Sequence, residues 1–214
     1  MAKATPCIRV LAGTNGAGKS SIGGEFLRRS GGDYFNPDAA ARQIRAAKPQ
    51  LSVADANGQA WAEGLRRLDA AIRNQRDYCF ETTLGGETIT RRLEQALDAG
   101  QEVRIWYVGL NTVELHLARV AARVQKGGHD IPAADISRRY RNSRLNLIRL
   151  LPKLTELLIY DNSTDADPVA GKMPRLQLVL HLQRGKVVGR SDFAQTPEWA
   201  KPVVAAALKL AGQR

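Results

Sequence analysis

The residues with the clearest chemical potential lie near the N-terminus, where eight positions match the spacing G-x-x-x-x-G-K-[ST] in full. The match and the serine after it comprise Gly13, Thr14, Asn15, Gly16, Ala17, Gly18, Lys19, Ser20 and Ser21. Such glycines let backbone N–H groups turn around phosphate oxygens, and the helix that follows adds its positive N-terminal end. Lys19 is expected to reach the β- and γ-phosphates of ATP, and Ser20 to ligate Mg²⁺. The segment therefore predicts a site for ATP and Mg²⁺.

A candidate general base, Asp38, follows a second short apolar run in Asn36-Pro37-Asp38. A carboxylate at this point can accept the proton of an acceptor hydroxyl while phosphoryl transfer proceeds. An aspartate beside proline also commonly caps a helix. Both interpretations remain open, and one side chain can serve both roles.

A third apolar run ends in Glu81-Thr82-Thr83. Side chains alternate along a strand, so Glu81 and Thr83 are expected on one face and Thr82 on the other. Glu81 is a candidate for holding a Mg²⁺-bound water or a substrate hydroxyl, and Thr83 for donating to substrate. The alternative is a solvated strand end without function.

Arginines cluster on two segments joined by Gly127-Gly128. Arg119 and Arg123 lie four residues apart, hence on one helix face, and Arg139 follows the turn. Guanidinium groups stabilise the charge that develops on a transferring phosphoryl group. We expect residues 119–140 to form an arginine-rich helical lid, with Arg123 and Arg139 over the phosphate and Arg119 toward substrate. A solvated basic face is the alternative, and it is the interpretation we favour for the arginines farther along.

The elements that must position these residues alternate along the chain. Strands are expected at 7–12, 33–36, 78–83, 103–110 and 157–161, and helices at 18–29, 37–47, 53–75, 87–98, 113–125 and from 132 to just before 152. A hairpin and a helix are expected over about 175–211. This order predicts an α/β fold in one domain over residues 1–214, with a parallel sheet flanked by helices and its ligand site at the carboxyl ends of the strands.

Composition narrows the setting. The chain has 214 residues, two cysteines expected to be buried thiols, and a net charge of +11. No apolar run has the roughly 18 residues of a membrane span, so no membrane association is expected and a cytoplasmic location is favoured. The positive charge suits anionic ligands, either a nucleotide with a second phosphorylated substrate or a nucleic acid. Because the arginines are spread along helices, without aromatic residues interleaved, nucleic acid is the second choice.

Taken together, these residues resemble the zeta toxin family and its chromosomal zeta-like relatives. The segments that carry the resemblance are LAGTNGAGKSS (11–21), FNPD (35–38), FETTL (80–84), RVAARV (119–124), GGHDIP (127–132), RRY (138–140) and YDNS (160–163). They span about residues 8–163, and the ordered set is far more specific than the first motif alone.

The resemblance implies a P-loop kinase fold and an ATP-dependent small-molecule kinase. Zeta toxins phosphorylate the sugar of UDP-N-acetylglucosamine, so a UDP-N-acetyl amino sugar, or another nucleotide-like anion, is the implied acceptor. By resemblance, Asp38 is the general base, Lys19 the phosphate-loop lysine, and Arg123 and Arg139 the arginines over the transferring phosphate; Glu81 and Thr83 are substrate or Mg²⁺-site residues. An antitoxin, when present, is a separate chain. An ATPase linked to nucleic acid and a regulatory ATP-binding module remain the alternatives.

Overall fold

The fold is built on seven strands. A computed structural model describes residues 5–19, 22–23, 26, 34–164 and 176–212. Its strands are β1 (Cys7–Ala12), β2 (Tyr34–Phe35), β3 (Tyr78–Thr82), β4 (Glu102–Gly109), β5 (Glu156–Asp161), β6 (Gln177–Gln183) and β7 (Lys186–Arg190). Every strand expected from the sequence is present, although β2 is confined to two residues.

The helices of the described residues occupy the intervals between these strands. They are α2 (Pro37–Ala47), α3 (Val53–Arg73), α4 (Glu87–Asp98), α5 (Val113–Gln125), α6 (Ala133–Leu150) and α7 (Lys201–Gly212), with a short 3-10 turn, η1 (Phe193–Gln195). Polar caps set several starts: Ser52 accepts from the Asp55 N–H, and Thr112 from the Leu115 N–H. The helix expected over 18–29 falls largely outside the described residues, although Ile22, Gly23 and Phe26 are helical. None of the described helices combines the length and apolar character that a membrane span needs.

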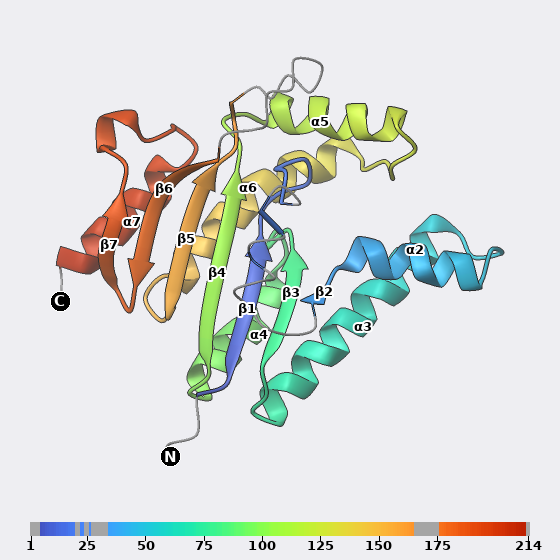
Figure 1. Ribbon diagram of the computed structural model, residues 1–214, viewed down its shortest axis with the longest axis horizontal. Helices are drawn as coiled ribbons and strands as arrows, with labels where there is room; N and C mark the ends of the chain where they lie inside the picture. The colour runs from blue at the N-terminus through green and yellow to red at the C-terminus, as the bar shows by residue number, and fades with distance from the viewer. Residues whose placement is uncertain (1–4, 20–21, 24–25, 27–33, 165–175, 213–214) are drawn as a thin grey trace.

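All seven strands form one sheet in the order β2-β3-β1-β4-β5-β6-β7 (Figure 1). The first five are parallel, and the hairpin of β6 and β7 extends the sheet with antiparallel pairs. The expected parallel sheet flanked by helices is therefore confirmed, with an antiparallel extension. Because β2, β3 and β1 are neighbours, their carboxyl ends meet at one edge, and the N–H of Gly13 bonds the carbonyl of Thr82 at 3.2 Å.

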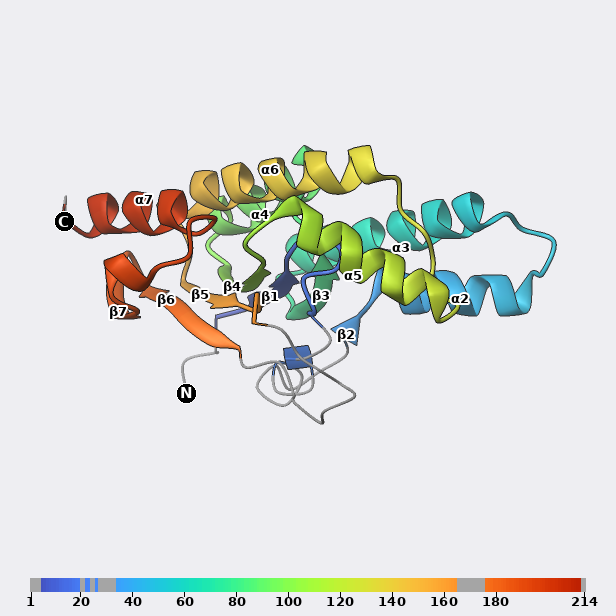
Figure 2. The same ribbon diagram turned by 90° about the horizontal axis from the view of Figure 1, so that it is seen from above.

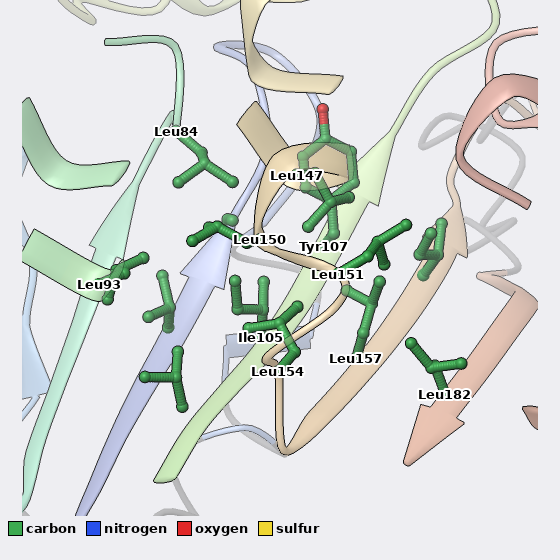
Figure 3. Packing of buried hydrophobic residues seen from close by; sticks show 14 of the residues in the cluster. Leu84, Leu93, Ile105, Tyr107, Leu147, Leu150, Leu151, Leu154, Leu157 and Leu182 are labelled. Carbon is green, nitrogen blue, oxygen red and sulfur yellow. The ribbon is translucent and has the colours of Figure 1, made fainter. Parts of the chain in front are cut away.

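Two apolar clusters hold the sheet in place, since alternate residues of each strand face opposite sides. On one side, α4, α6 and α7 lie along the sheet (Figures 1 and 2), and leucines of α6 pack onto Ile105, Tyr107 and Leu157 (Figure 3). On the other side, Phe26 packs edge-on against Trp106, with ring centroids 5.4 Å apart. Both cysteines, Cys7 and Cys79, are free and buried, as expected.

Helices α2 and α3 are attached differently. They pack on each other through a separate small cluster of Ala41, Ala56 and Ala60, beyond the β2 edge of the sheet. Figure 1 shows this helical pair projecting past β3. The pair thus forms a side wall next to the strand ends that carry Asn36 and Glu81.

Candidate active site

The phosphate loop leaves β1 at Gly13 and is shaped by three glycines. Gly13, Gly16 and Gly18 have φ values of 143°, 81° and 82°, a left-handed backbone that disfavours other residues. At Gly16 space also matters, because a Cβ there would lie 2.7 Å from the carbonyl oxygen of His116. Thr14, Ala17 and Lys19 of the loop are buried, and Asn15, Gly16 and Gly18 are half-buried. Ser20 and Ser21, expected to complete the site, lie outside the described residues.

Side chains from two other elements fix the loop. His116 of α5, which is 1% exposed, places its Nδ1 2.7 Å from the carbonyl oxygen of Asn15. Asn162, after β5, donates its Nδ2 to the carbonyl of Ala17 at 2.9 Å. Burial, reinforced by the nearby cation of Lys19, lowers the pKa of His116 to about 4. The imidazole is therefore neutral near pH 7, and we assign its proton to Nδ1, where it donates to the loop.

Glu81, at the end of β3, is engaged from three directions. Its Oε2 accepts from the hydroxyl of Tyr34 at 2.6 Å and from the Nδ2 of Asn36 at 2.9 Å, while Oε1 lies 3.4 Å from Nζ of Lys19. Burial raises the pKa of Tyr34, and Glu81 raises it further, so the phenol keeps its proton and donates. Lys19 also donates to the carbonyl of Gly13 at 2.8 Å. The glutamate thus holds the phosphate-loop lysine in place.

Asp38 is the second residue of α2, and its side chain is exposed. The cap of this helix is Asn36, whose Oδ1 accepts the N–H of Ala39 at 3.0 Å. The interpretation of Asp38 as a helix cap was therefore wrong: the asparagine two residues earlier has the extended backbone and the side-chain bond that a cap requires. Asp38 lies in the first turn of α2, at the positive end of the helix, and its side chain is exposed there.

The arginines of α5 and α6 separate into distinct positions. Arg139 donates from Nη1 to Oδ1 of Asn15 at 2.9 Å, and it packs so closely on Gly85 that a Cβ there would lie 2.7 Å from its Cγ. Arg123 donates to the carbonyl of His129 at 2.8 Å, within the turn between the helices. Arg119 donates to the carbonyl of Asn162 at 2.9 Å, near the end of β5. Arg139 therefore contacts the phosphate loop directly.

Helix α6 also fixes the loop between β3 and α4. The hydroxyl of Ser143 donates to the carbonyl of Thr83 at 2.7 Å and contacts the hydroxyl of Tyr107 at 2.9 Å. Asn146 donates to the carbonyl of Leu84 at 2.9 Å. Leu84 itself has a φ of 53°, so the chain turns sharply where the strand stops. The basic helix is therefore part of the site's framework as well as its cover.

A cavity of about 530 Å³ opens beside the phosphate loop. Its wall includes Asn15 of the loop and, from the strand ends and α2, Asp38, Glu81, Thr82 and Thr83. Thr82 was expected on the opposite face, but β3 ends at this residue and alternation ends with it. The cavity thus brings Asp38, Glu81, Thr83 and Arg139 together, as expected from the sequence. Arg119 and Arg123 are not among its lining residues.

Several lining residues were not anticipated as site residues. They come from α3, from the turn before α6 and from the start of α4, and they include Asn57, Gly58, Trp61, Leu65, Thr88, Ile89, His129 and Pro132. Trp61 lies on α3, and the turn before α6 carries His129. Its Nε2 lies 3.1 Å from Nδ2 of Asn57, so the turn contacts α3 across the mouth of the cavity.

Fold and site define the class of protein. A glycine-rich phosphate loop between β1 and a helical segment, at the carboxyl edge of a mostly parallel sheet, is the architecture of P-loop kinase-like proteins. The particular family follows from comparison with known sequences: a sequence model of the zeta toxin family matches residues 1–166, and the chain belongs to that family. A protein of Haemophilus influenzae, strain Rd, described as uncharacterized, is 35% identical over 128 residues, which are 60% of this chain and 88% of that protein.

Solved structures share the fold at low sequence identity. A chain in the crystal structure of AvrRxo1-ORF1:-ORF2 with ATP has a TM-score of 0.65 at 16% identity, covering 95% of this chain. This chain spans 64% of that one. A structure of the PezAT chromosomal toxin-antitoxin system of Streptococcus pneumoniae has a TM-score of 0.58 at 14% identity, covering 100% of this chain and 88% of that chain. At these identities the likeness establishes the fold.

Proposed function

We propose that this chain is an ATP- and Mg²⁺-dependent phosphotransferase that moves the γ-phosphoryl group of ATP to a hydroxyl of a small, anionic, nucleotide-linked acceptor. The observation that carries the proposal is the shared wall of the two sites. Asn15 belongs to the phosphate loop and also lines the cavity, where Asp38 presents an exposed carboxylate. A donor held by the loop and an acceptor held in the cavity would therefore meet beside a potential general base.

The loop residues fit a nucleoside triphosphate. Left-handed backbone at Gly13, Gly16 and Gly18 is what a loop needs in order to turn N–H groups toward phosphate oxygens. Lys19 is buried, and its partners among the described residues are the backbone carbonyl of Gly13 and, at 3.4 Å, Glu81. A phosphate group bound in the loop would form a further ion pair with this ammonium group. Lys19 would thus hold the β- and γ-phosphates, with Glu81 orienting it.

A bound Mg²⁺ would supply positive charge beside the β- and γ-phosphates. Ser20, by its place in the motif, is the residue proposed to ligate it. Among the described residues, no group of three or more His, Cys, Asp or Glu could hold a metal ion by itself. This suits a cation that is held chiefly by phosphates and water. Glu81, already engaged with Tyr34, Asn36 and Lys19, would act on such water from outside the coordination shell.

The remaining roles follow from position. Asp38 would accept the proton of the acceptor hydroxyl, and Thr83 would contact the acceptor from the opposite wall. Arg139, which donates to Asn15 and lies 3.6 Å from a carboxylate oxygen of Asp135, would exchange such an acceptor oxygen for one of a phosphoryl group. Arg123, bonded to the turn, would follow if the lid of residues 119–140 closes. Arg119, near the end of β5, is proposed to contact the nucleotide from that side.

A UDP-N-acetyl amino sugar is the leading acceptor, on the strength of family membership. A separate antitoxin chain is a proposed partner, because the related structures are a toxin-antitoxin system and a two-component complex.

An ATPase acting on nucleic acid is disfavoured by the charge arrangement. Many arginines are paired locally with carboxylates, as in Arg66 and Arg67 with Glu63 and Arg149 with Glu94, and so do not form a continuous basic stripe.

Asp38→Asn tests the proposal, because asparagine has nearly the same shape as aspartate and accepts protons poorly. We expect the phosphotransfer rate to fall on the order of 10²–10⁴-fold with ATP affinity unchanged. Asp55→Asn is the matched control, since Asp55 lies in the first turn of α3 but outside the cavity wall. Each variant removes a first-turn charge worth about 0.3–1 kcal/mol of stability. Transfer to UDP-sugars, nucleosides and dinucleotides is followed by product mass, and an Asp38→Asn rate equal to that of Asp55→Asn would refute the assignment.

A further inference from the structure

The cavity has two ends of different character. Near the phosphate loop its wall carries Asn15, Asp38 and Glu81. On the side formed by α3, which lies past β3 and so farther from the loop (Figure 1), the wall includes Trp61, a residue that is 50% exposed. Tryptophan is a residue that proteins usually bury in large part. An aromatic surface left open inside a binding cavity therefore needs a reason.

Packing of α3 does not supply that reason. The helix attaches to the rest of the protein through Leu68 and Ala71 in the main core and through Ala56 and Ala60 against α2. Trp61 belongs to none of the buried clusters of the described residues. Its indole therefore contributes to the surface of the cavity more than to the stability of the fold.

The neighbours of Trp61 on α3 keep that surface clear. Asn57, Gly58, Gly64 and Leu65 line the same cavity and lie four or fewer residues from Trp61 on the helix. A Cβ at Gly58 would meet nothing within 4 Å, so there is open space beside it. At Gly64 a Cβ would lie 2.7 Å from the ring of Phe35, so the glycine brings a second aromatic wall close. Gly58 therefore leaves open space on the helix face that carries the indole, and Phe35 adds a second ring to the wall.

Polar groups at the rim complete this end. Nδ2 of Asn57 and Nε2 of His129 are 3.1 Å apart, and both residues line the cavity. Between them an amide and an imidazole offer hydrogen-bond donors and acceptors at the edge of the aromatic surface. Arg138 also lines the cavity, on α6, where it donates to Asp135 of the same wall at 2.8 Å. The aromatic surface with its polar neighbours is suited to a planar ring with polar edges.

We propose that the Trp61 end of the cavity is the subsite for the nucleobase of the acceptor, with Trp61 as the stacking platform and Asn57 and His129 at the base edge. The proposal rests on the proposed function, since it names which part of the acceptor lies away from the transferred phosphoryl group. Stacking of a base on an aromatic side chain tolerates all bases, because each has a π-face. Trp61 is thus a specificity residue for nucleotide-linked over simple sugar acceptors, and it takes no part in the chemical step.

Tryptophan fluorescence tests the subsite without any need for catalysis. The chain has three tryptophans, and Trp106 and Trp199 are buried, so a ligand entering the cavity affects Trp61 first. The protein is first saturated with Mg²⁺ and a non-hydrolysable ATP analogue, which fills the phosphate loop. Uridine, cytidine, adenosine and guanosine 5′-monophosphates are then titrated, with ribose 5-phosphate as the ligand that lacks a base. We expect saturable quenching by at least one mononucleotide, none by ribose 5-phosphate, and none in Trp61→Leu.

Steady-state kinetics gives the second measurement, with an acceptor that the parent enzyme is found to phosphorylate. Trp61→Leu is expected to raise KM for that acceptor by about 5–150-fold with kcat nearly unchanged, and Trp61→Phe is expected to restore most of the affinity. Leu145→Ala is the matched control, because Leu145 is 58% exposed and does not line the cavity. Melting temperatures of all three variants should match the parent.

The outcomes separate the two proposals. Quenching by no mononucleotide, or equal quenching by ribose 5-phosphate, would overturn the subsite. Active enzyme whose KM is unaltered in Trp61→Leu would also overturn it, while leaving the kinase in place. Quenching that depends on Trp61, in a protein that phosphorylates none of the acceptors tested, would support the subsite and count against the proposed function.

Discussion

The phosphate loop and the acceptor cavity lie side by side and are built in opposite ways. The loop is one continuous stretch of chain, buried or half-buried throughout its described residues, and held by His116, Asn162 and Arg139 from three different elements. The cavity is assembled from strand ends, four helices and a turn, and two of its principal side chains, Asp38 and Trp61, are exposed. The proposed donor and acceptor sites therefore differ in construction: one is a single loop, and the other is assembled from several elements.

The difference has a physical reason. A triphosphate is bound mainly through backbone N–H groups, which demand a fixed main-chain path and little else. An acceptor is recognised by side chains, and these can be exchanged on a helix without disturbing the sheet. Helices α2 and α3 suit that role because they pack on each other through a small alanine cluster of their own. Under the proposed function, the loop that holds the donor is fixed by the sheet, and the helices that would recognise the acceptor are freer to vary in sequence.

The largest effect is expected from Lys19→Ala, in the loop that would hold the donor. Loss of the buried ammonium should lower phosphotransfer on the order of 10³-fold by removing a charge at the β- and γ-phosphates. The fold should persist, because Glu81 retains its bonds from Tyr34 and Asn36. Lys48→Ala, at an exposed lysine that ends α2, is the control. If Lys19→Ala turned over ATP at the rate of the control, the loop could not be the site that holds the triphosphate through this lysine.

A pH titration of stability measures how firmly His116 holds the loop. Its folded pKa of about 4 lies below the ordinary value near 6.5, so the folded protein resists a proton that the unfolded chain accepts. The contribution of this residue to the free energy of unfolding is fully present above about pH 6.5. It is lost as the pH falls toward 4, by about 3 kcal/mol in all. His116→Asn keeps an N–H donor at the same point and removes the titration. Urea unfolding at several pH values should give a smaller loss for this variant across that window, and parallel curves would contradict the assignment.

A pair of glycine substitutions compares the two regions directly. Gly16→Ala places a Cβ 2.7 Å from the carbonyl of His116 at a φ of 81°, so strain of about 1–3 kcal/mol and weaker ATP binding are expected. Gly58→Ala adds a methyl group in open space within α3, and stability should rise by about 0.4–1 kcal/mol. Thermal melts and ATP-analogue titrations distinguish the cases. Equal tolerance at both positions would mean that the loop is less constrained than its contacts imply.

The sequence was most informative where a feature is local. The phosphate loop, the order of strands and helices, the C-terminal hairpin and the family were all predictable, because periodicity and a contiguous motif carry them. The parallel pairing of β2, β3 and β1 also followed from alternation, and it correctly placed Gly13, Asp38 and Glu81 at one edge.

Long-range geometry was beyond the same reasoning. Trp61 fits the apolar spacing of α3, and only the placement of α3 beyond the sheet edge leaves its indole in a cavity. Asn36 and Asp38 are both acceptable caps by residue type, and backbone conformation decides between them. The contact of His116 with Asn15 joins residues 101 positions apart, and no local pattern marks it.

The C-terminal segment changes how the family's extent should be understood. Shared sequence ends near residue 166, but the main core continues into Leu180, Trp199 and Val203. Trp199 fills the space above Gly109, where a Cβ would lie 2.2 Å from the indole, and donates to Asp161 at 2.7 Å. A domain boundary placed at residue 166, where the family match ends, would therefore divide a single hydrophobic core. Members of the family can diverge in this segment only if whatever replaces it still closes the same side of the sheet.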